Sequence, residues 1–267
     1  MTDRSPLRIH RGGLTDRPAA DTAVSRAVLL RVASGDEPET FRLSRTGLLV
    51  AFGKQDTNRA GFRDAVLAAR ANGYEALVRL AGGRPVVFHD GTLTFAYAVR
   101  EETPVDGIKD RFVLVADVMV GALARLGVDA RVGEIPGEYC PGEYSVNARG
   151  AKKLVGIGQR LIRGAAHVGG VIVVDGADRV RDALLPVYEA LGIDWDPGTV
   201  GSVADEMPGA TLGAVADAVV AVLGERFDVS EGEPSPGTYA LAETLEPEHL
   251  APAFGPEDEG LGEAAAG

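Results

Sequence analysis

The chain has 267 residues, of which 45% are hydrophobic and 25% charged, with a formal net charge of -12. This composition is typical of a globular protein, and the acidic balance argues against nucleic-acid binding, which needs clustered Lys and Arg over a broad face. The single cysteine, Cys140, excludes an internal disulfide framework, and no Cys/His spacing indicates a metal site. No apolar run resembles a secretory signal or a membrane span, so we expect a cytoplasmic protein that does not associate with membranes.

Helix and strand patterns alternate irregularly along the chain. Apolar residues at helical spacing predict helices over residues 21–32, 61–72, 110–126, 179–191 and 211–227, the last with Thr211 as its N-cap. Short apolar runs between glycine-bearing turns predict strands over residues 41–43, 48–52, 76–80, 85–88, 93–99 and 128–132, and two more around Lys153 and after His167. Strands clustered in hairpins and covered by a few helices indicate an α+β fold with a largely antiparallel, mixed sheet.

The C-terminal region has a different composition. Residues 231–267 contain nine acidic residues, no Lys or Arg, and frequent Pro and Gly. Such a segment buries too little apolar surface to offset its ordering entropy. We therefore expect one folded domain over residues 1–228 and an acidic, flexible tail over residues 229–267.

A basic stretch within this acidic chain is the first candidate site. No Asp or Glu occurs between Tyr144 and Val174, whereas five Lys or Arg do. Gly156 and Gly158 alternate there with apolar residues, and strand glycines favour close approach of a ligand to the backbone. A local positive field suits an anionic ligand such as a carboxylate or phosphate. The alternative is a solvated basic hairpin beside a core strand.

A glycine hairpin with flanking arginines is the second candidate. Gly82 and Gly83 follow Arg79 between two predicted strands, and the segment ends in His89-Asp90. A Gly-Gly pair lets backbone amides approach a ligand, and arginine neutralises an acid or a phosphate. The alternatives are a tight turn for the glycines and a structural hydrogen-bonding role for His89.

In order and separation, these two motifs resemble those of the biotin/lipoate protein ligase and octanoyltransferase family. Gly47 to Asp56 also resembles the early strand and turn of that family, and the resemblance covers about residues 20–225. It implies the catalytic-domain fold of the biotin protein ligases, which is related to class II synthetases.

The resemblance also implies roles for individual residues. Lys153 matches the lysine that contacts the acyl carbonyl or acyl phosphate, where a fixed cation stabilises developing charge. We expect its replacement by Ala to abolish transfer and to leave the fold intact. The residues matched to the acyl- or adenylate-binding surface are Arg79, Gly82, Gly83, His89, Gly156, Gly158, Gln159 and His167.

Cys140 separates two enzymes of this family. It lies 13 residues before Lys153 in a turn-forming sequence. One octanoyltransferase class carries its nucleophilic cysteine in the loop before the same lysine strand, at a spacing about two residues longer. A thiol near a lysine is expected to carry more thiolate. The alternative is an inert, half-buried small hydrophobe.

Three functions stay open at this point. The favoured one is a ligase that attaches lipoate or octanoate to a lysine with ATP and Mg²⁺, because two basic motifs would neutralise an adenylate phosphate. The second is a Cys140-dependent octanoyltransferase that takes its acyl group from octanoyl carrier protein and needs no cofactor. The third is a non-catalytic lipoate- or biotin-binding module. For both enzymes the resemblance implies the same acceptors, namely lipoyl domains of 2-oxoacid dehydrogenases or the glycine cleavage H protein.

Overall fold

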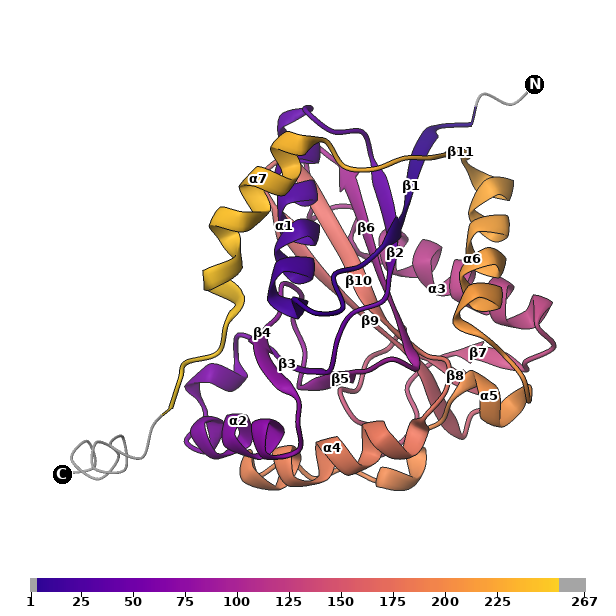
Figure 1. The fold of residues 1–267 in the computed structure, drawn as a ribbon. Helices are drawn as coiled ribbons and strands as arrows, with labels where there is room; N and C mark the ends of the chain where they lie inside the picture. The colour runs from indigo at the N-terminus through magenta and orange to yellow at the C-terminus, as the bar shows by residue number, and fades with distance from the viewer. Residues whose placement is uncertain (1–3, 255–267) are drawn as a thin grey trace.

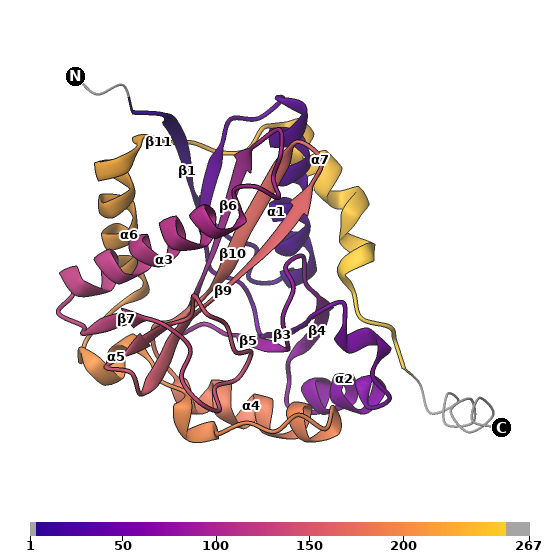
Figure 2. The same ribbon diagram turned by 180° about the vertical axis from the view of Figure 1, so that it is seen from behind.

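The computed structural model describes residues 4–254, which form an eight-stranded sheet, a three-stranded sheet and helices around them (Figures 1 and 2). The large sheet has the order β11-β1-β2-β6-β10-β9-β8-β7, and the small sheet has the order β4-β3-β5. The strands of the large sheet are β1 (Pro6–Gly12), β2 (Thr40–Ser44), β6 (Thr92–Arg100), β7 (Ala130–Val132), β8 (Val146–Ala148), β9 (Lys152–Ile162), β10 (Ala165–Val173) and β11 (Asp228–Glu231). Those of the small sheet are β3 (Leu49–Phe52), β4 (Glu75–Val78) and β5 (Val86–Phe88).

Most strand pairs are antiparallel. Strand β10 pairs with β6 on one side and with β9 on the other, and this long central ribbon carries the glycines of the basic stretch. Parallel pairing is confined to β1 with β2, β1 with β11, and β3 with β4. The expected α+β fold with a largely antiparallel mixed sheet is therefore confirmed.

Helices cover the sheets on several sides (Figure 1). They are α1 (Pro18–Ser34), α2 (Phe62–Ala71), α3 (Ile108–Arg125), α4 (Ala177–Ala190), α5 (Val203–Glu206), α6 (Leu212–Arg226) and α7 (Pro236–Leu245), with 3-10 turns at Asp56–Asn58, Pro197–Thr199 and Glu246–His249. One apolar cluster joins α3 and α6 to the large sheet, and a second of similar size joins α2 and α4 to the small sheet. A third joins α1 to α7.

Local sequence signals located most of these elements. All five predicted helices are present within a few residues of their expected bounds, and Thr211 accepts the N–H of Ala214 as an N-cap should. Local sequence patterns did not predict β1, β8, β11, α5 or α7. Strands β8 and β11 have only three and four residues, and β1 pairs with β11 from the far end of the chain.

The expected tail is wrong for residues 229–254. Strand β11 extends the sheet beside β1, and α7 lies along α1, where Ala242 and Leu245 are buried. The composition of a segment averages over all faces of a helix, whereas packing needs only one apolar face. Small apolar residues on one face of α7 are therefore enough for it to pack on α1. Residues 255–267, also assigned to the tail, lie outside the described residues.

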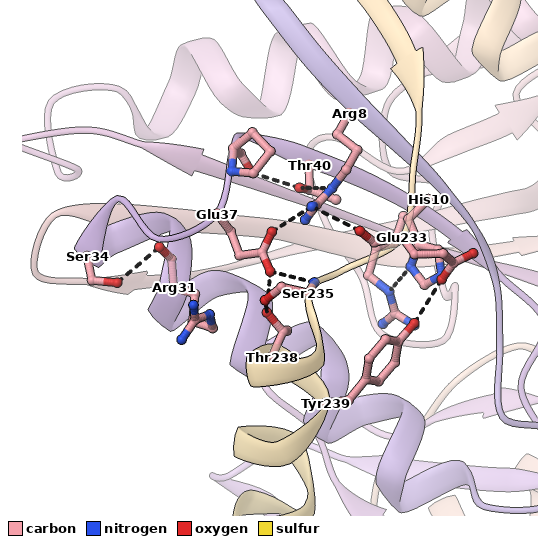
Figure 3. Close-up of polar contacts among 12 residues, drawn as sticks. Arg8, His10, Arg31, Ser34, Glu37, Thr40, Glu233, Ser235, Thr238 and Tyr239 are labelled. Carbon is pink, nitrogen blue, oxygen red and sulfur yellow. Dashed lines mark hydrogen bonds and ion pairs between the residues drawn. The ribbon is translucent and has the colours of Figure 1, made fainter.

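A polar cluster fastens this C-terminal segment to the N-terminal half (Figure 3). The buried carboxylate of Glu37 accepts the N–H of Ser235 at 2.8 Å and the hydroxyl of Thr238, and it pairs with Arg8 at 2.5 Å. Glu233 accepts the hydroxyl of Tyr239 at 2.9 Å. We call the group of Arg8, Glu37, Ser235 and Thr238 the C-terminal clamp.

None of the helices formed by residues 4–254 is both long enough and apolar enough to cross a membrane.

Candidate functional site

The candidate site is a cleft of about 510 Å³ beside the central ribbon. The loop between β4 and β5 forms one wall, and the loop between β7 and β8 forms another. Strands β9 and β10 contribute the floor, and the start of α3 contributes an apolar edge. Residues from motifs far apart in sequence line it together, namely Arg79, Gly82, Gly83, Cys140, Gly156 and Gln159.

Cys140 lines this cleft with a constrained backbone. Its φ is +43°, a left-handed value that a non-glycine residue adopts at an energetic cost. Its N–H donates to the hydroxyl oxygen of Tyr188 at 3.0 Å, and that hydroxyl donates to the carbonyl of Pro85 at 3.0 Å. These contacts hold the loop so that the sulfur lies against Arg79, whose Nη2 donates to Sγ at 3.4 Å.

Lys153 lies beneath the same loop, and its side chain is 0% exposed. Its Nζ pairs with Oε1 of Glu138 at 2.8 Å and donates to the carbonyls of Tyr139 at 2.9 Å and Cys140 at 2.7 Å. An ammonium group has three N–H donors, so these contacts use all of them. The lysine therefore orders the cysteine loop, which is a structural role that was not anticipated from the sequence. Its predicted contact with an acyl ligand stays a prediction.

Glu138 is the buried partner that completes this loop. Its Oε1 also accepts the hydroxyl of Ser145 at 2.6 Å and the N–H of Gly142 at 3.3 Å, and its Oε2 accepts the N–H of Ile135 at 3.2 Å. A buried carboxylate needs such compensation for its lost hydration. The only signal in the sequence was an acidic residue two positions before the cysteine, which is too common to indicate a buried ion pair.

The glycine hairpin approaches the cysteine closely. Gly83 has a φ of +102°, and a Cβ placed on it would lie 2.5 Å from Nη2 of Arg79 and 2.8 Å from Sγ of Cys140. A Cβ on Gly82 would meet no atom within 4 Å. The predicted close approach is therefore present at Gly83, but the atoms that occupy the space belong to the protein itself.

Strand β9 supports this hairpin from below. A Cβ on Gly158 would lie 3.2 Å from Cβ of Ala81, so the missing side chain lets the hairpin rest on the strand. Gln159 accepts from Nε of Arg111 at 3.0 Å and donates to the carbonyl of Ile108 at 2.7 Å. It thereby fixes the start of α3 at the edge of the cleft. Arg111 was not identified from the sequence, because it is one of several charged residues on a predicted helix.

Both predicted histidines lie outside the 510 Å³ cleft. His89 is fully buried, its Nδ1 accepts the N–H of Gly91 at 3.0 Å, and burial together with Arg179 lowers its pKa. This position argues against the predicted role in ligand binding and favours the structural alternative. Burial, aided by Arg42, lowers the pKa of His167 to about 4, so its ring is neutral at pH 7.

His167 lines a smaller inner cavity of about 80 Å³. This cavity shares Arg79, Phe88 and Gly170 with the cleft, so the two hollows lie on either side of the same residues. Nδ1 of His167 and the hydroxyls of Thr46 and Thr94, which also line it, have no hydrogen-bond partner within the described chain. The smaller cavity is therefore mostly apolar, with a few polar atoms that lack a partner.

Comparison with known proteins shows which family this chain belongs to. The family model described as the lipoyl protein ligase A/B catalytic domain matches residues 17–224. The chain belongs to that family. Its relatives include an octanoyl-[GcvH]:protein N-octanoyltransferase of Geobacillus kaustophilus, 31% identical over 64% of this chain and 60% of the relative. A lipoyl-[GcvH]:protein N-lipoyltransferase of Listeria monocytogenes is 28% identical over 71% of this chain and 70% of the relative.

Solved structures of the lipoyl protein ligase family share the fold. A lipoate-protein ligase A bound with ATP superposes with a TM-score of 0.72 at 18% identity, covering 92% of this chain and 95% of the other. A bipartite lipoate protein ligase from Thermoplasma acidophilum gives a TM-score of 0.70 at 21% identity, with 93% of each chain covered. At this level of identity, these similarities show a shared fold and do not assign an activity to the chain.

Proposed function

We propose that this lipoyl protein ligase family member transfers an octanoyl or lipoyl group between protein lysines through a thioester on Cys140. The observation that carries the proposal is the placement of its sulfur in the cleft beside Arg79, in a loop held by Lys153, Glu138 and Tyr188. A nucleophile needs such an ordered position relative to the bond that it attacks.

The chemistry runs in two balanced steps. The Cys140 thiol gives up its proton as its sulfur attacks the carbonyl carbon of the donor acyl-lysine amide. The C–N bond breaks, a thioester forms, and the donor amine leaves with that proton. The amine of an acceptor lysine then attacks the thioester, a new amide forms, and the thiol is regenerated. The guanidinium of Arg79 is a charged donor within hydrogen-bond distance of the sulfur and is suited to stabilise the oxyanion that develops in each step.

The relatives support the choice of partners. Their names describe octanoyl and lipoyl transfer from the glycine cleavage H protein to protein acceptors. We therefore propose acylated H protein as donor and the lipoyl domains of 2-oxoacid dehydrogenases as acceptors. No cofactor takes part in this reaction.

Intact mass spectrometry tests the proposal. Wild-type protein mixed with octanoyl H protein and no ATP should gain about 126 Da, the mass of one octanoyl group bound to a thiol. Cys140→Ser should form no hydroxylamine-sensitive adduct and should lose nearly all transfer to apo lipoyl domain. Transfer by Cys140→Ser at the wild-type rate would contradict the thioester mechanism.

ATP-dependent ligation is the second candidate, and basic residues beside the hairpin favour it because they suit phosphate groups. The described residues contain no cluster of three His, Cys, Asp or Glu suited to hold a metal ion, so Mg²⁺ would be held mainly by the nucleotide phosphates. Acceptor modification with lipoate, ATP and Mg²⁺, retained in Cys140→Ser, would establish the ligase. Binding of lipoate without transfer from either donor would indicate the non-catalytic module.

A further inference from the structure

A further hollow of about 370 Å³ adjoins the glycine hairpin. We call it the basic groove. Its lining residues come from the turn after β3, from the hairpin and from β9, and they are Lys54, Gln55, Asn58, Gly82, Gly83 and Arg160. This lining includes two cations and no carboxylate.

The two cations of the groove are available for a partner. Lys54 and Arg160 are exposed, and neither side chain has a hydrogen bond or ion pair within residues 4–254. The neighbouring Arg26 differs, because it pairs with Glu248 at 2.8 Å. In a chain with a net charge of -12, an uncompensated basic hollow is a distinct electrostatic feature.

The groove and the cysteine cleft meet at the glycines. Gly82 and Gly83 line both hollows, so the hairpin backbone is the boundary between Lys54 and Arg160 on one side and Cys140 on the other. A Cβ on Gly82 would meet no atom within 4 Å, which leaves the space above this residue open. A flexible lysine arm seated above the groove can cross there to reach the sulfur.

We infer that the basic groove docks an acidic surface of the acyl-carrying protein domain, so that the modified lysine of that domain crosses Gly82 toward Cys140. This inference rests on the proposed function, since it names the surface by which a protein substrate is recognised. The chain as a whole carries a net charge of -12, and complementary charge at one place both steers the encounter with an acidic partner and fixes its orientation.

Charge reversal separates docking from chemistry. In Lys54→Glu/Arg160→Glu, the KM for the carrier domain should rise about 10-fold or more, with kcat retained, because charge complementarity changes association rates by about 10 to 10³. Raising the ionic strength should raise the carrier KM of the wild type, so that the difference in carrier KM between the wild type and the double variant becomes smaller. Acylation of Cys140 by the octanoyl thioester of N-acetylcysteamine, a small neutral donor, should be retained.

Arg163→Glu provides the matched control. This arginine is also exposed and directly follows β9, the strand that carries Arg160, but it lies outside the groove lining, so its reversal should leave the carrier KM close to that of the wild type.

Three results would overturn the inference. The carrier KM could be unchanged in the double variant, or acylation by the small thioester could fall as much as transfer from the carrier. The third is a higher KM for ATP with an unaltered carrier KM, which would identify the groove as a phosphate site. The Cys140→Ser variant tests the thioester mechanism independently of docking. The carrier KM tests docking, and it can be measured whichever group is the nucleophile.

Discussion

Lys153 combines a full charge with complete burial, and this combination determines what its removal should do. Without it, the carboxylate of Glu138 is left buried and loses the ammonium that compensates it. Breaking a buried ion pair from one side costs about 3–5 kcal/mol. We predict that Lys153→Ala lowers the free energy of unfolding by about this amount, measured by urea denaturation.

Lys152 is the control for this variant. It precedes Lys153 in β9, is only half-buried, and its Nζ donates to the carbonyl of Gly198. Lys152→Ala should change the free energy of unfolding by about 0.5 kcal/mol or less. Equal urea midpoints for the two variants would show that the buried pair does not hold the cysteine loop.

Gly83 is the other residue whose structure predicts a sharp effect. A side chain there is strained by the φ of +102° and would displace Arg79 from Cys140. We predict that Gly83→Ala loses about 1–2 kcal/mol of stability, the cost of a left-handed conformation for an L-residue, and slows Cys140 acylation.

Gly82→Ala has open space for its Cβ and should keep wild-type stability in the same denaturation experiment. If the two alanine variants were equally stable, the conformation of Gly83 would not be required.

At the scale of elements, the C-terminal clamp fixes α7 through one carboxylate. Burial would raise the pKa of Glu37, but hydrogen bonds from Thr238, Ser235 and Arg8 outweigh it and lower the pKa to about 2. An unfolded Glu titrates near about 4.3. The clamp therefore contributes its full stability above the unfolded pKa, and this contribution is lost as the pH falls through about 2.

The clamp is tested by comparing Glu37→Gln with the wild type across this pH range. The stability difference should be constant above pH 5 and should shrink steadily as the pH falls toward 2, while amide exchange in Pro236–Leu245 is faster in the variant at pH 7. Asp36→Asn, which alters an exposed neighbour outside the clamp, should leave exchange in α7 unaltered. A difference that does not vary with pH would contradict the assigned pKa.

At the scale of the whole molecule, α7 is part of the folded unit. A chain truncated after residue 231 loses the partner of the α1 face, including buried Ala242 and Leu245. Emptying apolar contacts of this size costs about 2–5 kcal/mol. We predict a melting temperature lower by about 2–4 °C for each kcal/mol lost.

Truncation after residue 254 is the matched experiment, since it keeps every contact described above. Its melting temperature should equal that of the full chain. If the chain ending at residue 231 melted at the same temperature as the chain ending at residue 254, residues 232–254 would be dispensable for the fold.

The sequence by itself determined the features that depend on local spacing. The helix over residues 211–227 and its Thr211 cap follow from periodicity and one hydroxyl, and both are present. The hairpin and lysine-strand motifs likewise indicated the family, and the structure brings Arg79, Gly83 and Cys140 together in one cleft. A motif matches a family by its residue types and their order along the chain, and this match is enough to identify residues that share a site.

Only the tertiary structure decided what each of these residues contacts. It placed Lys153 against Glu138 beneath the cysteine loop, moved His89 away from the cleft, and packed α7 on α1 in a segment whose composition indicated a tail. These outcomes depend on which distant residues meet and on what each buried charge finds to compensate it. Burial and pairing belong to the assembled chain, so no local pattern in the sequence contains them.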